Sequence, residues 1–228
     1  MDNLYLHEEA LLLALKDREG TIESGTMYQF ALGGSLLSEL LLHERIRVES
    51  QKRKDFVEIA DPTPVGDVLL DECLERIRTS KRRATIETWV SRFSNIGKLK
   101  HRIAQQLCLK GILREDEDKI LLLFRRKIYP EINPEPERRL IERLREAIFE
   151  DNAQMTQNTA ILISLAHATS LLKVIFDRKA LKSRKKHIER IAAGEMTGRA
   201  VAKAVEAIQA AIMAAVIASA VTASTAGS

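Results

Sequence analysis

The chain has 228 residues and a mass of 25.7 kDa, with 45% hydrophobic and 30% charged residues, a balance that excludes a disordered or low-complexity protein. Aromatic residues make up only 4%, so the core must be built mainly from leucine, isoleucine, valine and alanine. The formal net charge of +4 is too small to identify a partner, and any anion-binding patch must therefore be local.

The N-terminal part of the chain predicts two helices followed by a hairpin. Leucines in a helical stripe predict a helix over Leu4–Lys16, and a second apolar helix is expected over Met27–His43. The alternation of basic and apolar residues in Arg45–Glu49 is typical of a half-exposed strand. Phe56–Ile59 can pair with it, which gives a hairpin with Lys52–Lys54 at its tip.

The middle of the chain predicts three further helices and a second hairpin. The helices are expected over Asp67–Arg78, Thr85–Phe93 and Leu99–Leu109. Ile112–Leu113 and Ile120–Tyr129 are expected to pair as strands around an acidic turn, Arg114–Asp118. A helix followed by a hairpin resembles a winged helix, so a nucleic-acid-binding protein is the alternative reading. Nucleic acid is disfavoured as a partner because the acidic turn would lie where phosphates bind.

The C-terminal part predicts four helices. One opens at Asn133–Glu137 and runs to Ile148, and another, Gln157–Phe176, is apolar on nearly all sides and is expected to be the central buried helix. A basic amphipathic helix over Lys179–Ala193 and an Ala-rich helix over Thr197–Thr222 follow. With no repeat and no linker, we expect a single, mainly α, globular helical domain over residues 1–222, with one or two β-hairpins and a flexible tail over 223–228.

Cysteine usage and hydropathy indicate the compartment. Cys73 and Cys108 fall on apolar helical positions far apart, where buried reduced thiols are expected. Residues 1–17 lack the features of a signal peptide, and the most apolar run, Ile208–Val221, is shorter than the ~20 residues of a spanning helix. We therefore expect a cytoplasmic protein that associates with a membrane peripherally.

No motif for catalysis or metal binding is found. The acids at the start of the third helix, Asp67, Asp71 and Glu72, are explained by capping and by the helix dipole. His167 lies in an apolar helical stretch and is expected to be a core histidine with a hydrogen-bond partner. We therefore expect no enzyme, with no catalytic residue, no metal site and no cofactor.

Repeated basic clusters are the chemically informative feature of the sequence. They are Lys52–Lys54, Lys81–Arg83, Lys98 with Lys100 and Arg102, Arg125–Lys127, and Lys182 with Arg184–Lys186. Gathered on one face, such clusters would attract anionic lipid headgroups with roughly 1 kcal/mol per basic side chain.

Several segments, in order, resemble the Golgi phosphoprotein 3-like family. They are Leu4–Leu13, Asp17–Gly20, Pro64–Glu72, Thr88–Trp89, Lys110–Leu113, Arg139–Ile141 and Leu165–Ala168. The resemblance implies a helical domain with a hairpin used in self-association, and binding of phosphatidylinositol 4-phosphate at a basic surface pocket. It also implies an adaptor role, in which the protein holds cytosolic tails of membrane enzymes.

The family's pocket carries over only in part. The family has a tryptophan in the loop where this chain has Thr21–Gly25, and an arginine where it has Gly33–Gly34. Of two basic residues before the Lys110–Leu113 turn, one aligns with Lys100 and the other with Gly97. Lys98 and Arg102 stand close by, so the predicted headgroup-binding residues are Lys98, Lys100 and Arg102.

The resemblance thus predicts a non-enzymatic peripheral membrane protein that binds phosphatidylinositol 4-phosphate or other anionic lipid headgroups. Binding is expected to be looser than in the family, because the aromatic wall and the second basic wall of the pocket are missing. The Lys-Arg-Lys tip of the first hairpin predicts weak homo-oligomerisation at most. The basic extension that precedes the domain in eukaryotic members is not present in this sequence, which suits a prokaryotic or divergent member.

Overall fold

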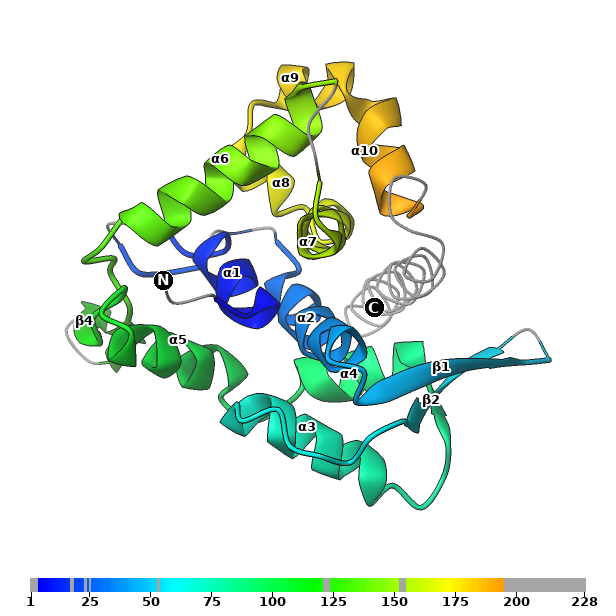
Figure 1. Ribbon diagram of the computed structural model, residues 1–228. Helices are drawn as coiled ribbons and strands as arrows, with labels where there is room; N and C mark the ends of the chain where they lie inside the picture. The colour runs from blue at the N-terminus through cyan, green and yellow to red at the C-terminus, as the bar shows by residue number, and fades with distance from the viewer. Residues whose placement is uncertain are drawn as a thin grey trace, which may run out of the picture.

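The computed structural model describes residues 4–16, 19–22, 24, 26–52, 54–120, 124–151 and 155–194 (Figure 1). These residues form helices α1 to α10 with a three-stranded and a two-stranded antiparallel sheet, which confirms the mainly α fold class. The predicted helix Thr197–Thr222 and the tail 223–228 lie outside the described residues. The domain extent of 1–222 therefore stays a prediction.

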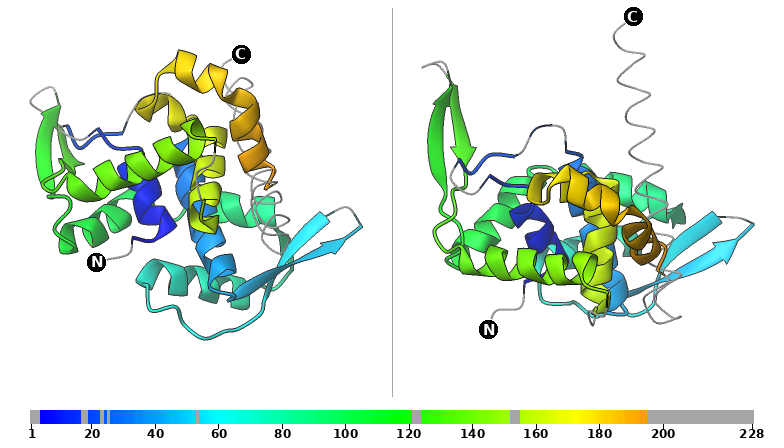
Figure 2. Two further views of the ribbon diagram at one scale, coloured as in Figure 1. Left: turned by 45° about the horizontal axis from the view of Figure 1, so that its top comes forward. Right: turned by 90° about the horizontal axis from the view of Figure 1, so that it is seen from above.

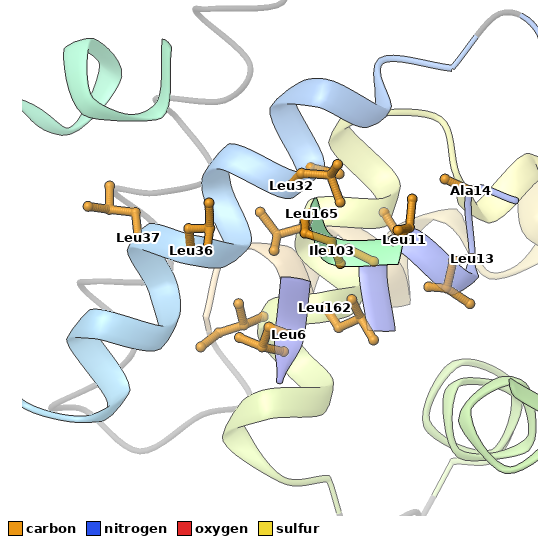
Figure 3. Packing of buried hydrophobic residues seen from close by; sticks show 14 of the residues in the cluster. Leu6, Leu11, Leu13, Ala14, Leu32, Leu36, Leu37, Ile103, Leu162 and Leu165 are labelled. Atoms are coloured by element: carbon orange, nitrogen blue, oxygen red, sulfur yellow. The ribbon is translucent and has the colours of Figure 1, made fainter. Parts of the chain in front are cut away.

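Helix α1 (Leu6–Leu12) occupies the centre of the molecule, and each of its seven residues is buried. Four longer helices contact it: α2 (Tyr28–Leu42), α5 (Leu99–Leu109), α6 (Glu135–Phe149) and α7 (Gln157–Ala168). Figure 3 shows leucine and isoleucine side chains from four of these five helices meeting around α1. Complete burial of one such side chain contributes ~1.5–3 kcal/mol, so this contact holds the helices together.

Helices α2 and α4 (Ile86–Ser94) approach each other closely at Gly33. A Cβ atom at this position would lie 2.7 Å from the backbone nitrogen of Ser94 and 2.7 Å from the carbonyl oxygen of Val90. Real Cβ atoms do not come so near, so the helix pair requires glycine here.

The first hairpin is confirmed. Strands β1 (Ile46–Gln51) and β2 (Lys54–Ile59) pair antiparallel, with Ile46 opposite Ile59 and Val48 opposite Val57. The short strand β3 (Ala84–Thr85) adds to β2. Between β2 and β3 lies α3 (Val68–Arg78), which begins where Asp67 Oδ1 accepts hydrogen bonds from the N–H groups of Leu69 and Leu70.

The second hairpin forms from other residues than predicted. Its strands are β4 (Asp116–Ile120) and β5 (Phe124–Ile128), so most of the predicted acidic turn is a strand. Acidic residues of β4 lie opposite basic residues of β5, with Glu117 facing Lys127 and Asp118 facing Arg126. Cross-strand pairs of opposite charge stabilise such a ladder and offset the low strand propensity of Asp and Glu. Figure 2 shows the two hairpins projecting from opposite ends of the helical body.

The C-terminal helices are shorter than predicted. Helix α7 is buried over Thr159–Ala166 but ends at Ala168, and Ser170 has a left-handed backbone with φ 65° before α8 (Leu172–Ile175). The expected helix Lys179–Ala193 is two helices, α9 (Arg178–Ser183) and α10 (Lys185–Ala192), separated at Arg184. Arg184 Nε donates to the carbonyl oxygen of Ile148 at 2.8 Å, which ties this break to the end of α6.

Candidate functional site

The predicted headgroup-binding residues lie at the beginning of α5. Lys98 precedes the helix in a left-handed backbone conformation (φ 57°) and has an exposed side chain, whereas Lys100 and Arg102 are half-buried. With 3.6 residues per turn, Lys98 and Arg102 lie on one side of the helix and Lys100 on another. The structure therefore places the three residues at the same end of α5 but not on the same face of the helix.

Arg102 is committed to a carboxylate. Its Nη2 donates to Glu72 Oε2 at 2.5 Å, and Arg76 donates to the same carboxylate at 2.7 Å. The hydrogen bond from Arg102 is the largest cause that holds the pKa of Glu72 below its usual range. Much of the positive charge of Arg102 is therefore neutralised from α3.

Lys100 lies next to a basic residue from another element. Burial, and then the charge of Arg126 on β5, lower the pKa of Lys100. Within the described part of the chain, neither Lys98 nor Lys100 pairs with a carboxylate, whereas Arg126 Nη2 donates to Asp118 at 2.8 Å. The sequence showed Arg126 as part of a separate cluster, and only the folded hairpin brings it to α5. We call Lys98, Lys100, Arg102 and Arg126 the α5 surface.

Hydrogen bonds fix the hairpin against α5. His101 Nδ1 lies 2.9 Å from the hydroxyl oxygen of Tyr129, and Lys127 Nζ donates to Glu115 Oε1 at 2.5 Å. Burial, followed by the charges of Lys100 and Lys127, lowers the pKa of His101, so the imidazole is neutral at pH 7. The N–H of Tyr129 also donates to the carbonyl of Gly20 at 2.9 Å, which connects the hairpin to the turn after α1.

Packing bears on the positions where the resemblance expects basic residues. At Gly33, one of the two glycines that stand where the family has an arginine, the backbone of α4 leaves no room for any side chain. At Gly97, where the family has a basic residue, a Cβ atom would meet nothing within 4 Å. A basic side chain is therefore excluded by packing at position 33, and position 97 is open.

The basic clusters do not all converge on the α5 surface. Lys52 and Lys54 belong to the first hairpin, at the opposite end from β4–β5 (Figure 2). Arg83 is paired with Glu49 at 2.9 Å and with Glu58 at 2.6 Å. Among the described residues of these clusters, Arg126 and Lys127 of β5 lie near α5, where their charges lower the pKa values of Lys100 and His101.

The charged pairs of the second hairpin argue against a nucleic-acid-binding wing. The basic residues Arg126 and Lys127 are paired with Asp118 and Glu115, so the hairpin alone does not present the uncompensated row of cations with which a wing would follow a nucleic-acid backbone.

No three histidine, cysteine, aspartate or glutamate side chains lie where they could hold a metal ion in the part of the chain that the structure describes. Asp67 caps α3, as predicted, and Asp71 Oδ1 accepts from the N–H of Val65 at 2.7 Å. His167 differs from the prediction: it is half-buried, lines a cavity, and has no hydrogen-bond partner among the described residues.

None of the helices that the structure describes combines the length and the apolar composition needed to cross a bilayer.

The chain is similar to known proteins both at the level of a family and at the level of a single relative. Residues 6–208 match the family model described as Golgi phosphoprotein 3 (GPP34). The chain is also similar to vacuolar protein sorting-associated protein 74 of Schizosaccharomyces pombe, at 29% identity over 220 residues. That alignment covers 82% of this chain and 65% of the relative, so the chain spans about two thirds of the relative's length.

Proposed function

The chain belongs to the Golgi phosphoprotein 3 family, and from this membership and the α5 surface we propose that it binds anionic lipid headgroups, including phosphatidylinositol 4-phosphate, as a non-enzymatic peripheral membrane protein. Lys98, Lys100 and Arg102 are the proposed contacts, with Arg126 beside them.

One observation carries the proposal. Lys100 and Arg126 come from different elements and lie close enough for the charge of Arg126 to lower the pKa of Lys100. A phosphate group placed beside them would relieve this repulsion and raise the pKa of Lys100 again. A nearby anion is therefore more favourable here than beside an isolated surface lysine.

Arg102 is expected to contribute less than the two lysines, because Glu72 already binds its guanidinium group. An incoming phosphate would have to compete with this carboxylate. We therefore expect binding to depend on overall negative charge more than on a particular headgroup, and to weaken with salt as exposed charges are screened.

Vesicle co-sedimentation tests the proposal. The three membranes are neutral, generally anionic, and phosphatidylinositol 4-phosphate-containing at matched total charge, each at low and physiological salt. We expect Lys98→Gln/Lys100→Gln to bind anionic vesicles about 10- to 30-fold more weakly than the unchanged protein, at about 1 kcal/mol per lysine.

A matched control is Lys81→Gln/Arg82→Gln, which removes two exposed charges from the loop between α3 and β3. This control should bind as the unchanged protein does. Absence of binding to every anionic vesicle, or equal loss in both double variants, would refute the α5 surface as the lipid site.

The adaptor role rests on family membership alone. As an adaptor, the membrane-bound protein would hold cytosolic tails of membrane enzymes. Weak homo-oligomerisation through the first hairpin likewise stays a prediction, which sedimentation velocity over a range of protein concentrations would measure.

A further inference from the structure

A second group of basic residues lies at α8 to α10, on the other side of α1 from α5 (Figure 1). The breaks at Ser170 and Arg184 turn the chain around a cavity of about 440 Å³ between the end of α7 and helices α8 to α10. Pockets of ~300–1,000 Å³ are the size that holds small molecules. We call it the α8–α10 pocket; its charged lining residues are Lys173, Arg178, Lys182 and Lys185.

These cations are largely uncompensated. None of the described residues that line the pocket is acidic. Of the nearest acids, Asp177 accepts hydrogen bonds from the N–H groups of Lys179 and Ala180, and Glu189 lies 3.7 Å from Lys185. Arg178 and Lys182 have no carboxylate partner among the described residues. The pocket therefore has an excess of positive charge that the rest of this region does not neutralise.

The interior of the same pocket is apolar. Leu172, Leu181 and Ile188 line it, and the first and last of these also belong to the hydrophobic core. His167 faces the pocket from α7, and burial lowers its pKa, so it adds no charge at pH 7. Apolar residues inside and cations around them match a molecule with an anionic end and a hydrocarbon end. A free phosphate would leave the apolar lining unused.

We propose that the α8–α10 pocket binds one anionic phospholipid, with the phosphate at Lys173, Arg178 and Lys182 and the start of an acyl chain against Leu172, Leu181 and Ile188. This site is distinct from the α5 surface and goes beyond the proposed function. Figure 1 shows α9 and α10 beyond α6 and α7, whereas α5 lies on the other side of α1. One chain could thus contact a membrane lipid at two separate places.

Calorimetric titration of the full chain with dihexanoyl phosphatidylglycerol, below its micelle concentration, tests the proposal. Dihexanoyl phosphatidylcholine lacks the net charge and glycerol 3-phosphate lacks the acyl chains, so both should bind at least tenfold more weakly. Lys173→Gln/Lys182→Gln should weaken phosphatidylglycerol binding about 10- to 30-fold. The matched control Lys179→Gln/Lys186→Gln removes two exposed lysines of the same region that do not line the pocket, and should leave binding unchanged.

Several outcomes would overturn the inference. Binding of glycerol 3-phosphate as tight as that of phosphatidylglycerol would show that the apolar lining contributes nothing. Tighter binding of a glutamate-rich peptide would assign the pocket to a protein partner. Loss of phosphatidylglycerol binding in Lys98→Gln/Lys100→Gln alone would place the lipid on the α5 surface, so that this inference fails while the proposed function stands. Equal binding by the pocket variant and the unchanged protein would also refute it, provided that circular dichroism shows both to be folded.

Discussion

The basic residues where α1 meets α5 and α6 can be compared with those around the α8–α10 pocket. In the first region, Lys110 Nζ lies 2.6 Å from Glu8 Oε2, and Arg143 Nη2 lies 2.9 Å from both carboxylate oxygens of Glu9. Both glutamates are buried. In the second region, Lys182 has no carboxylate partner among the described residues.

The difference lies in the neighbours and not in the cations themselves. A lysine or arginine beside a buried carboxylate stabilises the fold, because the carboxylate would otherwise be desolvated without compensation. A lysine without such a neighbour contributes little to stability but is available to an external anion. The α5 surface contains both cases, since Arg102 is paired and Lys98 and Lys100 are not.

The largest effect is expected where a buried pair is broken. Arg143→Ala leaves Glu9 buried without its cation, and should lower the free energy of unfolding by about 3 kcal/mol. Burial raises the pKa of Glu9 even with Arg143 present, which shows that this carboxylate is poorly solvated. Chemical denaturation measures the loss.

The control for this prediction is Arg139→Ala, one turn earlier on α6. Arg139 forms an exposed pair with Glu135, and its removal should cost no more than about 0.5 kcal/mol. Similar losses in the two variants would contradict the distinction between buried and exposed pairs.

Glu39 provides the reverse case, a buried acid without a lysine or arginine partner among the described residues. Burial is the main cause that raises its pKa to about 7, although the N–H of Leu6 donates to its Oε1 at 2.5 Å. Between pH 4.5 and 7 the folded chain binds more protons at this residue than the unfolded chain. The free energy of unfolding should therefore fall as the pH rises through this range, by on the order of 2–3 kcal/mol, and then level off.

Glu39→Gln should remove this dependence, because the amide cannot ionise and its oxygen can still accept from Leu6. The measurement is the difference in unfolding free energy between variant and unchanged protein at pH 5 and pH 8. A difference that is the same at both values would show that Glu39 titrates normally.

A smaller effect is expected when a paired cation of the α5 surface is released. Glu72→Gln removes the carboxylate that binds Arg102. The variant should bind anionic vesicles about fivefold more tightly, which corresponds to one additional available basic side chain. Glu75→Gln, which removes the partner of Arg78 on the same helix, is the control. Unchanged binding by Glu72→Gln would mean that Arg102 does not face the lipid.

The smallest effect on stability is expected for Lys182→Gln. Because this exposed lysine has no carboxylate partner among the described residues, the free energy of unfolding should stay within about 0.5 kcal/mol. Chemical denaturation checks this value. A loss above 1 kcal/mol would show that Lys182 is structural, and would weaken its assignment to the lipid.

Elements with a clear apolar period were predictable from the sequence. The boundaries of α5 agree with the prediction at Leu99 and Leu109, and those of α2 differ by one residue at each end. Here the side-chain pattern and the tertiary contacts favour the same helix. The mainly α class was predictable for the same reason, whereas the family was identified from the ordered set of segments that resemble it.

The breaks in the C-terminal helices were not predictable, because they depend on distant contacts. Ser170 is neither glycine nor proline, so no local signal marks its left-handed backbone. Arg184 ends α9 while it binds the carbonyl of Ile148, in the last turn of α6, and lies 2.8 Å from Asp151, just after that helix. Without these breaks the α8–α10 pocket would not exist, so Lys173 and Arg178 could not be grouped with Lys182 and Lys185 from the sequence.

The strands of the second hairpin and the position of Arg126 in the α5 surface were not predictable for a similar reason. An acidic run such as Arg114–Asp118 is typical of a turn when considered alone. The last three residues of this run form part of strand β4, because the basic residues opposite Glu117 and Asp118 come only later in the chain, at Lys127 and Arg126. The approach of Arg126 to Lys100 follows from that pairing.

The close contact of α2 and α4 at Gly33 limits how this protein can be redesigned. An arginine at position 33 would have to push two core helices apart, so substitution of this one of the two glycines cannot supply the arginine of the family's pocket. Gly97 has free space around it and a backbone outside the left-handed region, and it directly precedes Lys98. Selection for tighter lipid binding should therefore enrich basic residues at position 97 and leave position 33 unchanged.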